Sequence, residues 1–342
     1  DRGWSVTVYC QDDSGTRSDG ETDMWQGIER VFFRTRRGGS FGTIEFDFKC
    51  ARHCMGQPGI DLILGYNTAL FNLPQRLAGR RVLMNMDGIE WRRAKWGPVA
   101  KAWLFLNEVI GANLAHVTIA DHPRIADHIA RRCLKSPVMI PYGADRVETA
   151  DTAPLRALGL LPGRYVISIA RVEPENSILE LVQGARALPD GFRCVVLGNL
   201  DPANPYHARV KTAGGDRVIF PGAIYDTEVV AALRYHALVY LHGHQVGGTN
   251  PSLVEALGAG NAVLAHDNPF NRWTAGPGQF YFTGPDGCAK QIRLICSDPA
   301  GVARARRAAR KRFAEAFEWT DILSRYEDAL VGQCGQELLH AQ

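Results

Sequence analysis

Short apolar runs alternate with amphipathic stretches in the first part of the chain, which is the pattern of buried strands separated by helices. We expect strands at residues 5–10, 60–65, 81–86, 116–120 and 137–141. Helical patterns between them cover residues 94–108 and 123–133. Since short buried strands that alternate with helices are typical of parallel sheets, this half predicts such a sheet with helices on both faces.

The pattern starts again after a linker that lies near residues 142–154. The second series predicts strands at residues 165–170, 194–198, 218–220, 237–241 and 262–265, and helices at 177–187, 227–235, 252–258 and 299–317. We therefore predict an α/β chain of two Rossmann-like, doubly wound lobes, residues 1–145 and 146–316. Ligands of such folds bind beyond the carboxyl ends of the strands, so we expect a cleft between the lobes.

Composition argues against several other classes of protein. The 342 residues suffice for about two domains. The 39 Lys and Arg nearly balance the 36 Asp and Glu, for a net charge of +3, so we expect no nucleic-acid partner. No apolar run approaches the length of a transmembrane helix. The 8 cysteines are scattered, which favours reduced thiols in a cytoplasmic protein.

The segment 242–260 is the most informative part of the sequence, because it leads from an expected strand through a glycine-rich loop into a helix. Gly247 and Gly248 let the backbone approach a ligand closely, and amides at the start of a helix bind phosphate. As an alternative, Ser252 and Glu255 form a capping box at that helix. Pro251 has no N–H, so the amide donors that we expect are those of Thr249, Asn250, Ser252 and Leu253.

Charged residues also stand where other expected strands end. Arg171 would face the ligand as a partner for a diphosphate, or it is a surface arginine beside a glutamate. Asp87 and Glu90 would bind sugar hydroxyls or supply a base, or they belong to a turn and a helix start. His242 and His244 lack further ligands nearby, so we expect no metal site.

Several of these stretches together resemble the retaining GT-B glycosyltransferases of family 4, and most of all the bacterial rhamnosyltransferase-type subfamily. The resemblance rests on residues 8–10, 85–96, 140–145, 170–176, 220–226, 242–255 and 317–319. It implies the two-lobed GT-B fold, with residues 317–342 forming a helix that crosses back to the first lobe. Family members begin with a strand, a glycine-rich loop and a helix that we do not find before the first expected strand.

The resemblance also implies roles for individual residues. Asp87, Arg171 and Glu255 would be catalytic, with Arg171 on the diphosphate and Glu255 on the ribose hydroxyls. Glu90 and Asn67 would lie on the acceptor or sugar side. The donor would contact Asn176, Gly222, Ala223, Tyr225, Gly247, Gly248, Thr249, Asn250, Ser252 and Leu253. Two of these depart from the family, since Asn176 stands for a phosphate-binding lysine and Gly247 for a glutamate.

The function that follows is retaining transfer of a sugar, with rhamnose as one candidate, from a nucleotide diphosphate sugar to a glycan or lipid-linked acceptor. We expect this step in polysaccharide or cell-envelope synthesis, in the cytoplasm or at the inner face of the membrane, with peripheral membrane association left open. No Asp-x-Asp motif is present, so we expect no metal and no cofactor. The alternatives are a nucleotide-sugar epimerase of the same fold and a sugar-nucleotide-binding protein that has lost catalysis.

Overall fold

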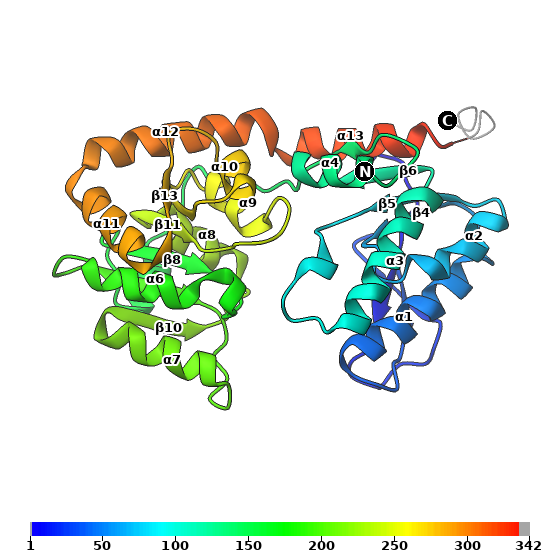
Figure 1. Ribbon diagram of the computed structural model, residues 1–342, viewed down its shortest axis with the longest axis horizontal. Helices are drawn as coiled ribbons and strands as arrows, with labels where there is room; N and C mark the ends of the chain where they lie inside the picture. The colour runs from blue at the N-terminus through cyan, green and yellow to red at the C-terminus, as the bar shows by residue number, and fades with distance from the viewer. Residues whose placement is uncertain (1, 335–342) are drawn as a thin grey trace. The chain divides into compact units, whose positions relative to one another are not determined.

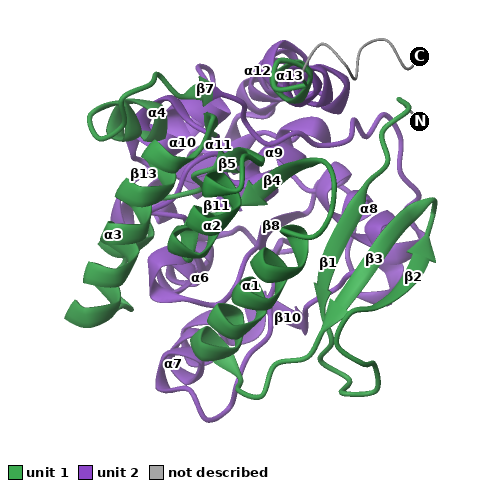
Figure 2. Ribbon diagram, turned by 90° about the vertical axis from the view of Figure 1, so that its right-hand side faces the viewer, with its two compact units in different colours: residues 1–120, 125–138, 328–342 green, residues 121–124, 139–327 purple. Residues whose placement is uncertain are grey.

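The computed structural model describes residues 2–334, which form two compact units. Unit 1 contains the described residues up to 120, residues 125–138 and those from 328 onward, and unit 2 contains residues 121–124 and 139–327 (Figure 2). The predicted helix over residues 317–342 includes 335–342, which lie outside the described residues. Within the described part, helix α13 covers Trp319–Val331 (Figure 1).

Unit 1 is built on a 4-stranded sheet in the order β4-β5-β6-β7, in which β4 pairs with β5 and β5 with β6 in parallel. The strands are β4 (Ile60–Leu64), β5 (Arg81–Asn85), β6 (Val117–Ala120) and β7 (Val138–Met139). The helices are α1 (Gly39–Cys54), α2 (Leu73–Leu77), α3 (Pro98–Leu114) and α4 (Pro123–Ala130). All four strands were predicted, whereas α1 was missed because its sequence alternates apolar and polar residues without a clear helical stripe.

A separate 3-stranded sheet in unit 1 has the order β1-β3-β2, with β1 (Thr7–Gln11), β2 (Glu21–Trp25) and β3 (Ile28–Phe33). The sequence predicted β1 but missed the hairpin of β2 and β3, because β2 is mostly polar and exposed. A two-residue turn joins them, in which Gln26 and Gly27 both have positive φ, as hairpin turns that suit the strand twist require.

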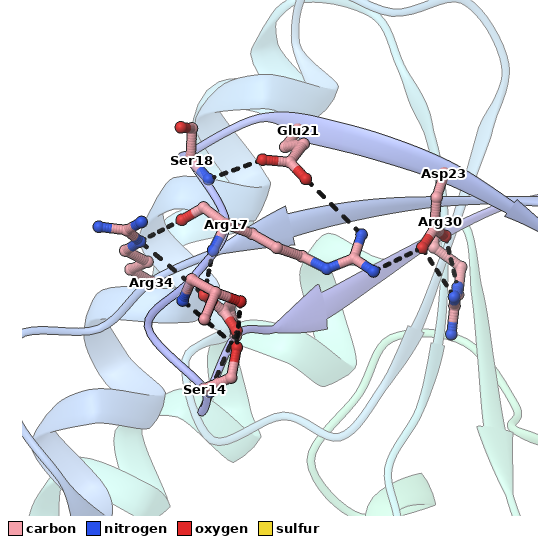
Figure 3. A network of polar contacts seen from close by, with 9 residues as sticks. Ser14, Arg17, Ser18, Glu21, Asp23, Arg30 and Arg34 are labelled. Atoms are coloured by element: carbon pink, nitrogen blue, oxygen red, sulfur yellow. Dashed lines mark hydrogen bonds and ion pairs between the residues drawn. The ribbon is translucent and has the colours of Figure 1, made fainter.

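Polar contacts across this hairpin replace the missing apolar pattern. Asp23 lies opposite Arg30 in the strand register and accepts two hydrogen bonds from its guanidinium, at 2.7 and 2.8 Å (Figure 3). Arg17 reaches the same carboxylate at 2.8 Å and lies over the ring of Phe32. These bonds hold the pKa of Asp23 below its usual range, with Arg30 as the largest cause. Cross-strand pairs of this kind stabilise a hairpin and set its register.

Unit 2 contains a 6-stranded, all-parallel sheet in the order β10-β9-β8-β11-β12-β13. The strands are β8 (Tyr165–Ile169), β9 (Arg193–Leu197), β10 (Val218–Gly222), β11 (Val239–His242), β12 (Val263–His266) and β13 (Phe280–Phe282). From β8 the chain adds strands in one direction and then returns to place β11 on the other side of β8. Because the direction of winding reverses here, the carboxyl ends of β8 and β11 flank the switch point at which such sheets bind ligands.

Helices cover both faces of this sheet, and both faces are buried. Val166 and Val196 belong to the apolar cluster beneath α6 and α11, whereas Ile167 and Val195 belong to the cluster with α8 and α9. The helices of this series are α5 (Ala153–Ala157), α6 (Ile178–Gly184), α7 (Pro205–Gly214), α8 (Thr227–Tyr235), α9 (Pro251–Gly258), α10 (Pro269–Ala275), α11 (Gly284–Ser297) and α12 (Pro299–Ala316) (Figure 1). Burial on both sides explains why the strands are continuous apolar runs.

Two general properties of the chain can be read from the described residues. All 8 cysteines lie among them and carry free thiols. No helix among residues 2–334 is both long and apolar enough to cross a membrane.

His242, the last residue of β11, is a histidine in the core of unit 2. It is 1% exposed, and neither ring nitrogen has a hydrogen-bond partner among residues 2–334. Its ring stacks on that of His244, with 4.4 Å between the centroids. Burial, and to a smaller extent the nearby His244 and His266, hold the pKa of His242 well below its usual range.

We expect acid to destabilise the protein through His242. Below about pH 6.5 the unfolded chain protonates this histidine and the folded chain does not, so the unfolded state binds the extra proton. The free energy of unfolding should therefore fall as the pH drops below about 6.5, by up to about 1.4 kcal/mol per pH unit from this group. Urea titrations at several pH values measure it. His242→Leu should show a shallower dependence on pH, and equal slopes would contradict the assignment.

Candidate functional site

The loops after β8 and β11 pack directly against each other at the switch point. The Gln245 amide donates to the carbonyl of Glu175 at 2.9 Å, and its side chain donates to the Ser177 hydroxyl at 2.8 Å. A Cβ at Gly243 would lie 2.1 Å from the Asn176 carbonyl oxygen, so only glycine fits this approach. The structure thus brings together the two motifs that the sequence singled out in this half of the chain.

Helix α9 begins differently from the capping box that the sequence allowed. Its N-cap is Asn250, whose side chain accepts a hydrogen bond from the Ser252 amide at 3.0 Å. Pro251 occupies the first helical position, which suits its fixed φ. Ser252 therefore lies inside the helix, where its hydroxyl donates to the Ile169 carbonyl at 3.1 Å. The capping-box interpretation of Ser252 and Glu255 is wrong, because the asparagine two residues earlier takes the cap.

The carboxylate of Asp121 lies against the glycine-rich loop at Gly248 and Thr249. The Thr249 amide donates to Asp121 Oδ2 at 2.9 Å, and the Thr249 hydroxyl donates to the Asp121 carbonyl. Gly248 lies against the same carboxylate, since a Cβ there would be 2.2 Å from Oδ1. The loop therefore holds an oxyanion of the chain itself on a backbone N–H. Sequence reasoning missed Asp121, which directly follows the strand expected at 116–120.

The amide donors predicted for a phosphate are partly used inside the chain. Thr249 donates to Asp121, Ser252 to the Asn250 side chain, and Leu253 to the Asn250 carbonyl at 3.1 Å. Gly247 is partly exposed and has a positive φ of 128°. The roles of these residues toward a donor stay predictions.

Arg171 is the cation at the carboxyl end of β8. Its side chain is exposed and makes no hydrogen bond or ion pair with residues 2–334. The Arg171 carbonyl accepts the Asn176 side-chain amide at 2.8 Å and the Glu173 amide at 2.8 Å, which closes the loop. Asn176 is 3% exposed, so it shapes the loop and leaves the positive charge to Arg171.

The loops after β9 and β10 form the next part of this edge. Asn199 follows β9, and its side chain accepts the Ala223 amide at 2.9 Å. The Gly198 amide donates to the Gly222 carbonyl at 3.2 Å. Tyr225 is 85% exposed and presents an aromatic ring to solvent. Sequence reasoning named Gly222, Ala223 and Tyr225 but missed Asn199, whose position directly after a predicted strand was the available signal.

Glu255, in α9, forms an ion pair with Arg234 of α8. The arginine side chain is 8% exposed and the glutamate side chain 44% exposed. Arg234 also donates to the Ser252 hydroxyl at 3.1 Å. Sequence reasoning did not identify Arg234 as the partner of Glu255, because the only signal in this segment was the apolar stripe of a helix.

Two candidates of unit 1, Asp87 and Glu90, follow β5, and the third, Asn67, follows β4. Asp87 is exposed and has a φ of 49°, a strained conformation for a residue with a side chain, and its amide donates to the Asn85 side chain at 3.0 Å. The Glu90 amide donates to the Tyr66 hydroxyl at 2.8 Å, and Asn67 follows Tyr66 with an exposed side chain. Tyr66 thus connects two of the predicted acceptor-side positions.

A buried carboxylate holds the segment that follows Glu90. Glu108 of α3 is fully buried and accepts the Trp91 indole N–H at 2.9 Å. Its other oxygen lies 2.9 Å from His128 Nε2 and 3.5 Å from the Arg132 guanidinium. Such a network fixes the turn that carries Asp87 and Glu90 by anchoring its partly buried tryptophan to a buried carboxylate. Among residues 2–334 there is no group of three or more His, Cys, Asp or Glu side chains placed to hold a metal ion.

The parallel sheet with its winding reversal defines a doubly wound α/β unit, and a cation and a carboxylate lie in its loops and helices near the switch point. Residues 159–312 match the family model described as glycosyl transferases group 1. This part of the chain is therefore similar to group 1 glycosyl transferases. Among curated proteins, none matches the chain in sequence.

Solved structures resemble almost the whole chain. Sucrose-phosphate synthase from Thermosynechococcus elongatus is 18% identical, with a TM-score of 0.77 over 97% of this chain and 90% of that one. HepE from Anabaena in complex with UDP-glucose is 16% identical, with a TM-score of 0.71 over 90% and 86%. An α,α-trehalose-phosphate synthase (UDP-forming) from Burkholderia vietnamiensis is 12% identical, with a TM-score of 0.69 over 95% and 93%. These similarities confirm the GT-B fold predicted from the sequence.

We expect Gly248→Ala to destabilise the loop, because the new methyl group would lie 2.2 Å from the Asp121 carboxylate. Overpacking of this kind costs about 1–3 kcal/mol of unfolding free energy, which chemical denaturation measures. Gly287→Ala is the matched control, since its nearest neighbouring atom would be 3.9 Å away.

A double variant tests whether contact with Asp121 is the reason that Gly248→Ala lowers stability. In an Asp121→Ala background, Gly248→Ala should cost less than it does in the wild type, because the clashing group is gone. An equal cost in both backgrounds would show that Asp121 does not hold this loop.

Proposed function

We propose that the protein transfers a sugar from a nucleotide diphosphate sugar to a glycan or lipid-linked acceptor, with retention of the anomeric configuration. The observation that carries the proposal is an exposed Arg171 beside the switch point, whose side chain has no partner among residues 2–334, in the same unit as a partly exposed carboxylate, Glu255. The Ser252 hydroxyl joins the two elements, because it bonds the last residue of β8 from the first turn of α9. HepE, which has the same fold, binds UDP-glucose, and this supports a nucleotide-sugar donor.

In this proposal Arg171 binds the diphosphate of the donor. Breaking the bond between the sugar and the diphosphate leaves negative charge on the phosphate oxygens, and a guanidinium placed there stabilises it. Asn176 is buried and closes the loop without adding a charge, so Arg171 carries the positive charge. The departing diphosphate would then help to remove the proton of the acceptor hydroxyl on the same face of the sugar, which retains the configuration.

The other donor groups have partners of suitable chemistry in unit 2. Glu255 would accept hydrogen bonds from the ribose hydroxyls, and the exposed ring of Tyr225 would lie near the nucleobase. The Gly247–Gly248 turn, which already accommodates the Asp121 carboxylate, has the chemistry to take another oxyanion or a sugar hydroxyl.

For the sugar and acceptor side we propose Asp87, Glu90 and Asn67. Support comes from the strained backbone of Asp87, since strain of this kind concentrates at functional positions. We further propose membership of the family 4, rhamnosyltransferase-type group, with rhamnose as one candidate sugar. The setting would be polysaccharide or cell-envelope synthesis in the cytoplasm or at the inner face of the membrane.

Arg171→Ala should weaken nucleoside diphosphate binding by roughly ten- to a hundredfold, because it removes a charge-assisted hydrogen bond to phosphate. Thermal shifts with UDP, GDP and dTDP identify the tightest diphosphate, and calorimetry then measures its affinity. Arg304→Ala, which removes an arginine 65% exposed on α12, is the control and should bind normally. Unchanged affinity in Arg171→Ala would refute the diphosphate role, and binding without transfer or hydrolysis would favour a protein that only binds sugar nucleotides.

Sugar transfer should survive EDTA. The sequence has no Asp-x-Asp motif for a metal-bound diphosphate, and Arg171 offers a permanent charge in its place. Product formation from the preferred donor, measured with and without EDTA, tests this. A loss of turnover that magnesium or manganese restores would show that the reaction needs a metal.

A further inference from the structure

Arg234 is a charged side chain placed in the interior of unit 2. It lies near the end of α8 and is 7% exposed as a residue. Its guanidinium contacts the Glu255 carboxylate and the Ser252 hydroxyl, while its Nε is buried without a hydrogen-bond partner among the described residues. Removing a cation from water is costly, and a single ion pair with a partly exposed partner often fails to repay that cost. Fold stability alone is therefore a weak reason for an arginine here.

The carboxylate that Arg234 contacts is shared between the interior and the solvent. Arg234 engages Glu255 Oε2, and Oε1 has no hydrogen-bond partner among residues 2–334. With 44% of its side chain exposed, Glu255 presents the remaining carboxylate edge to a ligand. One edge is thus held by the protein, and the other is available to a pair of hydroxyl groups.

A chain of hydrogen bonds connects this ion pair to the end of β8. The Ser252 hydroxyl donates to the Ile169 carbonyl at 3.1 Å, and the same carbonyl accepts the Tyr240 hydroxyl at 3.2 Å. Ser252 in turn accepts from Arg234 at 3.1 Å. Tyr240 is fully buried, so it helps to hold this carbonyl in place from the core. The position of the Glu255 carboxylate is therefore tied to the strand end that precedes Arg171.

We propose that Arg234 is a positioning residue for the ribose of the bound nucleotide and acts through Glu255. The inference rests on the proposed function, in which Glu255 binds the ribose hydroxyls. Arg234 fixes the rotamer of Glu255 before the nucleotide arrives, so that less conformational freedom is lost on binding. One terminal nitrogen of Arg234, Nη2, donates to both Glu255 and Ser252, and the rigid planar guanidinium holds that nitrogen in place, whereas the ammonium group of lysine sits at the end of a flexible stem.

Discrimination between a nucleotide and its 3′-deoxy form tests this role. Calorimetry is carried out with the tightest of UDP, GDP and dTDP and with the corresponding 3′-deoxy diphosphate. The wild type should prefer the hydroxylated form by at least about tenfold, since the lost bond involves a charged acceptor. In Arg234→Met the ratio should fall to about threefold or less, because Glu255 is no longer held.

Arg306→Met is the matched control for the loss of a largely buried arginine. Arg306 donates to the carbonyls of Tyr235 and Ala237, next to the end of α8, and contacts neither Glu255 nor Ser252. A role of Arg234 in stability alone would lower the affinity for both nucleotides equally in either variant. Only a role through Glu255 lowers the ratio in Arg234→Met and leaves it intact in Arg306→Met.

Two further variants complete the test. Arg234→Lys keeps the charge and supplies the answer if Arg234→Met does not fold, and its ratio should also fall. In a Glu255→Gln background, Arg234→Met should change the ratio no further, because the partner through which it acts is already altered.

The outcomes separate the inference from the function on which it rests. A wild type that does not distinguish the two nucleotides would overturn both the ribose role of Glu255 and the role of Arg234. A wild type that prefers the hydroxylated form, with Arg234 variants that keep the full ratio, would overturn the role of Arg234 alone.

Discussion

The reversal of strand order between β8 and β11 is the constraint on which the candidate donor site depends. It leaves two neighbouring strand ends without a crossover helix between them, so their loops meet directly. Gly243 makes this meeting possible, because any side chain there would collide with the Asn176 carbonyl. The two loops then hold each other through Gln245, and Arg171 and the glycine-rich turn take their places as a consequence.

Two arginines of unit 2 illustrate how burial decides what a charge does. Arg171 is exposed and unpaired with the described residues, so its charge is available to a ligand at little cost in desolvation. Arg234 is buried and needs partners, which it finds in Glu255 and Ser252. The same residue type therefore presents its charge to solvent at one position and supports a carboxylate from the interior at the other, and only the surroundings distinguish them.

The sequence predicted secondary structure best for those elements that bury an apolar face. The strands of unit 2 up to β12 were predicted because burial on both faces of the sheet makes them continuous apolar runs. Helix α8 was predicted because the side that it packs on the sheet gives an apolar stripe with helical spacing. The prediction missed β2, whose residues are polar and are joined to β3 by Asp23 and Arg30. It also assigned the cap of α9 to Ser252, since a local motif cannot show that Asn250 competes for the same amide.

By itself the sequence determined the parallel α/β architecture, the position of the glycine-rich loop and the cation after β8, because each depends on neighbours close in the chain. Only the tertiary structure decided that Asp121 would occupy that loop and that Arg234 would hold Glu255. Asp121 and Thr249 are 128 positions apart, and Arg234 and Glu255 are 21 apart. Contacts of this kind arise from the packing of separate elements, and no local pattern of residue types records which side chains will meet.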